Sequence, residues 1–169
     1  STSRHFADAA KLQPEIRATA DGKSYFVVWK SSPAPKRWIV SLHGAGIPAR
    51  GFATDDLVAW QPHLKDRDVG LICLQWWLGS GDRIEDFYLP LQSYREIDLA
   101  LRALNIEPGN VMLHGFSRGS ANTYAVAAID AGRGRHYFSL AVAHSGGVAL
   151  DYPPTRALLN GDRKSTRLN

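Results

Sequence analysis

The sequence has one cysteine, Cys73, among its 169 residues. A lone cysteine excludes an internal disulfide, and because Cys73 stands in an apolar run we expect it in the core. No apolar run approaches the roughly 20 residues of a membrane-spanning helix, and the first residues lack the apolar stretch of a signal peptide. We therefore expect a soluble protein with no membrane partner. Its compartment stays open, because a secreted form with its leader removed would read the same.

The sequence also lacks the marks of a nucleic-acid-binding protein or a metalloprotein. The formal net charge is +4, but the basic residues are not interleaved with aromatic ones and form no known nucleic-acid-binding module. No His, Cys and Asp residues cluster at the spacing of metal ligands. We expect no nucleic-acid partner, no metal and no organic cofactor.

Apolar runs of strand length alternate with segments of helical period. The runs that resemble buried strands are residues 24–30, 37–43, 68–76, 110–114 and 136–144, with a short sixth candidate at 156–160. Apolar residues recur every three or four positions from Leu91 to Leu104, and residues 120–131 are apolar nearly all round, with Gly132 as a natural C-cap. Apolar strands separated by helices predict one α/β domain with a mostly parallel sheet covered on both faces.

Residues 110–120 read NVMLHGFSRGS, in which an apolar run leads into a G-x-S-x-G motif. The motif alone is weak evidence, but a position between a strand and a buried helix is what a nucleophile elbow requires. The helix would direct its unpaired N–H groups and positive dipole end at the hydroxyl of Ser117. The alternative is that Ser117 merely caps the helix. The context favours Ser117 as a catalytic nucleophile.

A second glycine-rich turn, SLHGAG at residues 41–46, follows the strand at 37–43. Acyl transfer needs two N–H donors directed at the tetrahedral oxyanion. One normally comes from the residue after the nucleophile, here Arg118. The other comes from such a turn, here Ala45 with Gly46 assisting. The two turns in this order predict an oxyanion hole.

With HGAG after one strand and LNIEPGNVMLHGFSRGS leading into another, the sequence resembles the α/β-hydrolase superfamily. Within it, the chain is similar to small serine esterases related to feruloyl esterases, polyhydroxyalkanoate depolymerases and dienelactone-hydrolase-like enzymes. The resemblance covers about residues 24–162 and implies hydrolysis of a carboxylic ester through an acyl-enzyme on Ser117. It identifies the superfamily well and the substrate poorly.

The resemblance also implies an acid and a histidine after Ser117, in that order. Asp162 lies close to the place of the acid, although similar enzymes usually carry it a few residues beyond the position of Gly161, where this chain reads RKS. The last strand and the histidine loop have no counterpart. We therefore expect residues 1–162 to be a truncated hydrolase domain and residues 163–169 a non-native tail; a native terminus is the alternative.

Another histidine would have to replace the missing one. His144 ends the strand expected beside the elbow strand, at the carboxyl edge where ligands bind in open α/β sheets. It is the candidate for a substitute base, and a polar contact beside the site is its alternative role. His43 and His114 precede the two turns, and we expect both to serve packing and turn orientation.

The substrate side is expected in the aromatic segment WWLGSGDRIEDFY at residues 76–88. Adjacent strand residues face opposite ways, so we expect one of Trp76 and Trp77 in the core and the other along the cleft, with Phe116 beside it. Aromatic walls suit aryl esters, and an open cleft would also admit polymeric esters. The alternative is that all of these aromatic side chains pack in the core.

A sheet that lacks its last strand would expose an apolar edge, formed either by residues 138–143 or by the short run at 156–160. Such an edge tends to pair with another copy, so we expect a homodimer. A second function stays open beside the esterase: a catalytically dead domain that binds small aromatic ligands.

Overall fold

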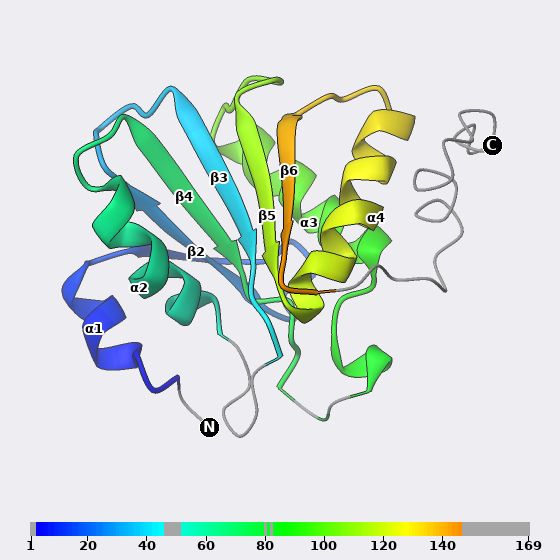
Figure 1. Ribbon diagram of the computed structural model, residues 1–169, viewed down its shortest axis with the longest axis horizontal. Helices are drawn as coiled ribbons and strands as arrows, with labels where there is room; N and C mark the ends of the chain where they lie inside the picture. The colour runs from blue at the N-terminus through cyan, green and yellow to red at the C-terminus, as the bar shows by residue number, and fades with distance from the viewer. Residues whose placement is uncertain (1–2, 46–51, 80, 82, 147–169) are drawn as a thin grey trace.

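The computed structural model describes residues 3–45, 52–79, 81 and 83–146. Within these residues the centre is a six-stranded sheet in the order β1-β2-β4-β3-β5-β6 (Figure 1). The strands are β1 (Glu15–Ala18), β2 (Tyr25–Lys30), β3 (Arg37–Leu42), β4 (Val69–Leu74), β5 (Val111–Phe116) and β6 (Phe138–His144). β2 pairs antiparallel with β1 and β4, whereas β4, β3, β5 and β6 run parallel.

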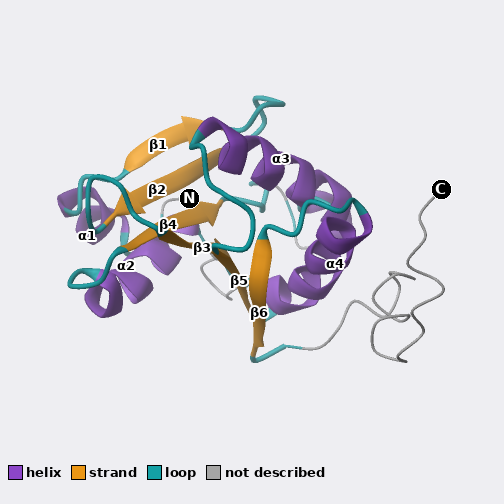
Figure 2. Ribbon diagram, turned by 90° about the horizontal axis from the view of Figure 1, so that it is seen from above, coloured by secondary structure: helices purple, strands orange, loops and turns teal. Residues whose placement is uncertain are grey.

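Helices cover both faces of this sheet. α1 (Phe6–Lys11) and α2 (Ala53–Leu64) lie on one face, and α3 (Pro90–Ala103) and α4 (Arg118–Gly132) lie on the other (Figure 2). A short 3₁₀ turn, Ile84–Asp86, interrupts the loop between β4 and α3. The α/β architecture with a mostly parallel, doubly covered sheet is therefore confirmed.

The central strands are apolar toward both helical layers. In β4, with the sequence VGLICL, every residue after the first is buried. Alternate residues of β4 enter two different cores: Ile72 and Leu74 pack on the side of α3 and α4, and Leu71 and Cys73 pack on the side of α1 and α2. A strand between two helical layers needs apolar residues at every position, which explains the continuous run in the sequence.

The two predicted helices, α3 and α4, begin and end close to the predicted residues. Pro90 is the first residue of α3, and the Leu89 N–H before it donates to Gln92 Oε1 at 2.8 Å. α4 differs slightly from the prediction, because it runs through Gly132. The left-handed residue that follows the helix is Gly134, at φ 66°.

The sequence analysis missed β1 and the antiparallel pairing of β2. β1 reads EIRA and none of its residues is buried, so it lacks the apolar signal of the other strands. Its backbone pairing with β2 makes it a strand. The candidate strand at 156–160 lies outside the described residues. Within those residues, no helix has both the length and the apolar character needed to cross a membrane.

Candidate active site

The candidate nucleophile lies where β5 ends and α4 begins (Figure 1). Ser117 joins the two elements with φ 50° and ψ −115°, a backbone conformation that is strained for a residue with a side chain. Its N–H donates to the His144 carbonyl at 2.8 Å, and its own carbonyl accepts from the Ser120 hydroxyl at 2.7 Å. The strained turn between strand and helix is the geometry of a nucleophile elbow.

Close packing explains the two glycines of the motif. A Cβ on Gly115 would lie 2.1 Å from Thr123 Oγ1, and one on Gly119 would lie 2.1 Å from the Leu42 carbonyl oxygen. Both distances are far shorter than any van der Waals contact. Glycine at these positions lets α4 start directly against the ends of β3 and β5.

The second glycine-rich turn meets the elbow in space. A Cβ on Gly44 would lie 3.2 Å from Ser117 Cβ and 3.0 Å from Phe116 Cδ1. Ala45 follows it and packs, half-buried, against the main core. The two expected oxyanion-hole segments are thus adjacent, although Gly46 lies outside the described residues.

His43 holds the start of this turn from inside the protein. It is 1% exposed, and the ring nitrogen Nδ1 lies 2.9 Å from the Gly44 carbonyl oxygen, to which it donates. Burial lowers the pKa of His43 to about 4, so the ring is neutral at pH 7. In this tautomer Nε2 is an acceptor, and no hydrogen-bond partner for it is found in the described part of the chain.

Both tryptophans of the 76–88 segment belong to the core. Trp76 and Trp77 are 4% and 5% exposed, which differs from the expectation that one of them lines the cleft. Trp76 Nε1 donates to the His43 carbonyl at 2.8 Å, so this side chain supports the HGAG turn from below. Trp77 packs edge-on against Phe52. Phe116, by contrast, is 43% exposed beside the nucleophile.

The Arg118 side chain lies over an aromatic ring. Its guanidinium carbon is 4.1 Å from the centroid of Phe87, a distance typical of a cation–π contact. The Phe87 ring packs on Trp76 with centroids 4.7 Å apart, and Trp76 packs on His43 at 5.8 Å. A continuous row of rings therefore joins the residue after the nucleophile to the HGAG turn.

His144 ends β6 beside the elbow, as expected. It pairs in register with Phe116, and the two rings are 5.2 Å apart between centroids. Its ring also lies 6.0 Å from that of His114. The side chain is exposed. The backbone of His144 thus contacts Ser117 directly, while its ring lies edge-on to the ring of Phe116 and tilted against that of His114.

A buried polar chain runs under α2, and the sequence analysis did not find it. The Ser41 hydroxyl donates to Asp56 Oδ2 at 2.5 Å, and His114 Nδ1 lies 3.0 Å from Ser41 Oγ. Burial raises the pKa of Asp56 to about 7 and lowers that of His114 to about 4. Because Ser41 and His114 are register partners on adjacent strands, only strand pairing brings them together.

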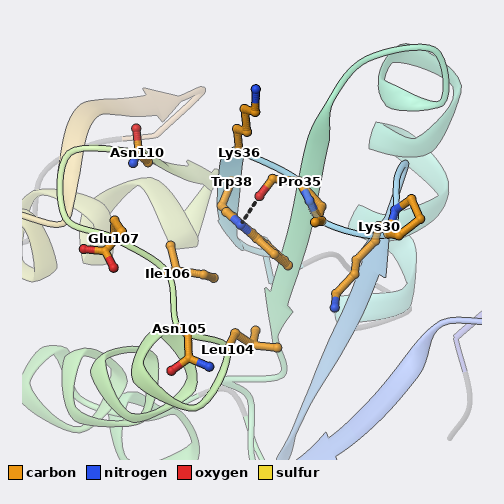
Figure 3. A pocket seen from close by; sticks show the side chains of 11 residues that line it. Lys30, Pro35, Lys36, Trp38, Leu104, Asn105, Ile106, Glu107 and Asn110 are labelled. Atoms are coloured by element: carbon orange, nitrogen blue, oxygen red, sulfur yellow. Dashed lines mark hydrogen bonds between the residues drawn. The ribbon is translucent and has the colours of Figure 1, made fainter.

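A cavity of about 580 Å³ lies at the other end of the strands, away from Ser117 (Figure 3). It opens near the start of β3 and the start of β5, between Lys30, Trp38, Ile106 and Asn110. No group of His, Cys, Asp and Glu side chains that could hold a metal ion is found among the described residues.

Comparison with solved structures places this arrangement among known folds. A hyperthermophilic esterase from the archaeon Pyrobaculum calidifontis superposes with a TM-score of 0.58 at 15% identity, covering 77% of this chain and 43% of that one. A thermostable carboxylesterase cloned from a metagenomic library gives 0.60 at 15% identity, covering 76% and 45%. Epoxide hydrolases of the α/β-hydrolase superfamily from metagenomes of hot environments give 0.52 at 20% identity, covering 80% and 42%.

The chain has the α/β-hydrolase fold. It spans less than half the length of these three structures. No family model matches the sequence, and a search of curated proteins found no match. Because the fold includes epoxide hydrolases as well as esterases, the chemistry has to be argued from the site.

Proposed function

We propose that the protein is a serine hydrolase of carboxylic esters, with Ser117 as the nucleophile that forms an acyl-enzyme. The observation that carries the proposal is the strained backbone of Ser117 between β5 and α4. Strain of this kind is a cost in stability of about 1–3 kcal/mol, and it clusters at active sites. A serine at that position presents its hydroxyl at the carboxyl edge of the sheet, where a substrate can reach it.

The oxyanion of the tetrahedral intermediate would be held by backbone N–H groups. Arg118 is the first residue of α4, so its N–H lies at the amino end of the helix, next to Ser117. Ala45, with Gly46, would supply the second donor from the turn that touches Ser117. Removing one such donor typically slows a hydrolase by about 10²–10³.

Proton transfer from Ser117 needs a base within hydrogen-bond reach of its hydroxyl. In the part of the chain that the structure describes, no hydrogen bond joins Ser117 Oγ to an imidazole or a carboxylate. His144 is the proposed base, because its backbone pairs with Ser117. Asp162, the proposed acid, lies outside the described residues. An elbow and oxyanion hole without the other triad members still leave catalysis of about 10³–10⁴ over water.

We propose, as a second candidate function, a domain that binds small aromatic ligands without turnover. The exposed ring of Phe116 beside Ser117 would provide the binding surface. Under the esterase proposal this surface takes the aryl part of an aromatic ester, or a segment of a polymeric one.

The experiment that separates the two functions is covalent labelling with a fluorophosphonate, read as intact mass. We expect one adduct on the wild-type protein and none on Ser117→Ala. Ser139→Ala, which removes an exposed serine of β6, is the matched control and should label like the wild type. A folded wild-type protein that does not label would contradict the esterase proposal and favour the binding domain.

We also propose that two copies associate along β6. β6 is the last strand of the sheet order, no residue in it is buried, and Leu140 is 53% exposed. An exposed apolar edge with unpaired backbone groups is a template for another strand.

A further inference from the structure

We propose that a cavity between α3 and the end of α4 binds a small organic phosphate, a phosphomonoester whose alcohol part is aromatic or otherwise apolar. This site lies away from the proposed nucleophile and does not depend on the esterase function. Ser117 precedes the first residue of α4 and Arg133 follows the last. The 15 residues of the helix, a length of about 22 Å, therefore separate the two.

The cavity has the size and the mixed lining of a small-molecule site. Its volume is about 500 Å³, within the usual range for such sites. α3 and α4 lie side by side on one face of the sheet (Figure 2). Among the described residues, all that line the cavity belong to α3, except Arg133. The apolar part of the wall consists of Leu91, Leu99 and the Tyr94 ring.

The charged part of the wall is mostly basic, with three arginines and one aspartate. The aspartate already has basic partners, because Asp98 forms an ion pair with Arg102 and its other carboxylate oxygen lies 3.9 Å from Arg135 Nε. For Arg95 and Arg133, the described part of the chain supplies no ion-pair or hydrogen-bond partner. Two guanidinium groups, one on each helix, are therefore available to an anion in the cavity.

Asp130 is a second acidic residue close to Arg133, but it is turned to other partners. It is 3% exposed and does not line the cavity. Its Oδ1 accepts from the Tyr94 hydroxyl at 3.4 Å, and its Oδ2 accepts from the Phe138 N–H at 3.3 Å. Arg133 instead lies over the Tyr94 ring, with its guanidinium carbon 5.7 Å from the ring centroid. Such a contact uses the face of the guanidinium and leaves its N–H donors in the plane.

The ligand class follows from the two guanidinium groups and the apolar wall together. Each guanidinium presents a planar fork of donors that matches a phosphate or a carboxylate. A carboxylate carries a single charge, whereas a phosphomonoester carries about −1.5 to −2 at pH 7 and has three acceptor oxygens. A phosphomonoester can therefore pair with two arginines at once. Leu91, Leu99 and the Tyr94 ring would cover its organic group.

NMR titration of the protein with three small molecules tests the site. Phenyl phosphate has both recognition elements, benzenesulfonate carries only one charge, and inorganic phosphate lacks the ring. We expect phenyl phosphate to bind about tenfold more tightly than either of the others. Arg95→Gln and Arg133→Gln should each weaken its binding by about tenfold, because each removes hydrogen bonds to a charged group. Both arginines are exposed, so both variants should fold.

Three further variants serve as controls. Arg37→Gln removes the same charge at an exposed arginine of β3, outside the cavity, and should change the affinity by less than about twofold because distant surface charges are screened. Leu91→Ala should weaken phenyl phosphate without affecting inorganic phosphate. Ser117→Ala should bind phenyl phosphate like the wild type.

A folded wild-type protein that shows no saturable binding of phenyl phosphate at millimolar concentrations would overturn the inference. Equal binding of benzenesulfonate would also contradict it, since a second charge would then have no partner. Equal losses in Arg37→Gln and Arg95→Gln would indicate a general attraction to a basic protein in place of a site. Loss of binding in Ser117→Ala would place the ligand at the nucleophile, which would equally refute the site between α3 and α4.

Discussion

β4 and β6 are parallel strands of the same sheet, yet their environments are opposite. β4 reads VGLICL and is buried after its first residue, whereas β6 reads FSLAVAH and has no buried residue. β4 lies between β2 and β3, and helices cover both of its faces. Among the described strands, β6 pairs with β5 alone, at the edge of the sheet. The comparison shows that apolar composition makes a strand, while its neighbours decide whether that strand is core.

The comparison predicts unequal costs for the same truncation in the two strands. Leu71→Ala in β4 should lower the free energy of unfolding by about 3 kcal/mol, because it leaves a cavity under α2. Leu140→Ala in β6 removes a side chain that is already half in water, and should cost less than about 0.5 kcal/mol. Urea denaturation measures both. Equal losses would mean that the β6 edge is covered in solution.

Burial under α2 also shifts the pKa of a carboxyl group, that of Asp56, which would not happen at the exposed β6 edge. The pKa of Asp56 is about 7 in the folded state and about 3.9 in an unfolded chain. Between pH 4 and pH 7 the unfolded chain therefore binds fewer protons at this group than the folded one does. The free energy of unfolding consequently falls as the pH rises through this window, by up to about 4 kcal/mol from this group.

Asp56→Asn removes that dependence while keeping an acceptor for Ser41. We expect the unfolding free energy of the variant minus that of the wild type to increase by about 2–3 kcal/mol from pH 5 to pH 8. Denaturation curves at both pH values measure it, and the histidines cancel because both proteins contain them. Asp66→Asn, at an exposed position, should show no such gain. A flat difference between Asp56→Asn and the wild type would show that α2 leaves this carboxyl group hydrated.

The smallest change in stability is expected when a charged side chain is introduced into β6, the edge strand. Leu140→Lys should alter the unfolding free energy by less than about 0.5 kcal/mol, but should convert the proposed dimer to a monomer, because a lysine blocks edge pairing. Sedimentation velocity distinguishes the two species. Leu91→Lys, at a leucine that is 50% exposed on α3, is the control and should stay dimeric. A monomeric wild type would contradict pairing along β6.

Local features of the site could be read from the sequence. The G-x-S-x-G motif between an apolar run and a helix predicted the strained turn at Ser117, and the HGAG turn predicted its neighbour. Both succeed because a sharp turn between packed elements needs glycine at set positions, here Gly115 and Gly119. The periodicity from Leu91 to Leu104 predicted α3 for the same kind of local reason.

Other features depended on contacts between distant residues. β1 has no apolar signal and exists because β2 offers it a pairing edge. Trp76 and Trp77 read equally well as cleft or core. Their burial was decided by the packing of Phe52, Phe87 and His43 around them.

The sequence by itself determined the five apolar strands, the helices α3 and α4 and the turn that carries Ser117, because these follow from the spacing of apolar residues and glycines along the chain. Only the tertiary structure decided that β4 is core while β6 is edge. It alone also brought Asp56, Ser41 and His114 into one buried chain, and set Arg118 on Phe87 beside the nucleophile. Burial, and the pKa values and preferred partners that follow from it, are properties of neighbours that the chain supplies from far apart in sequence.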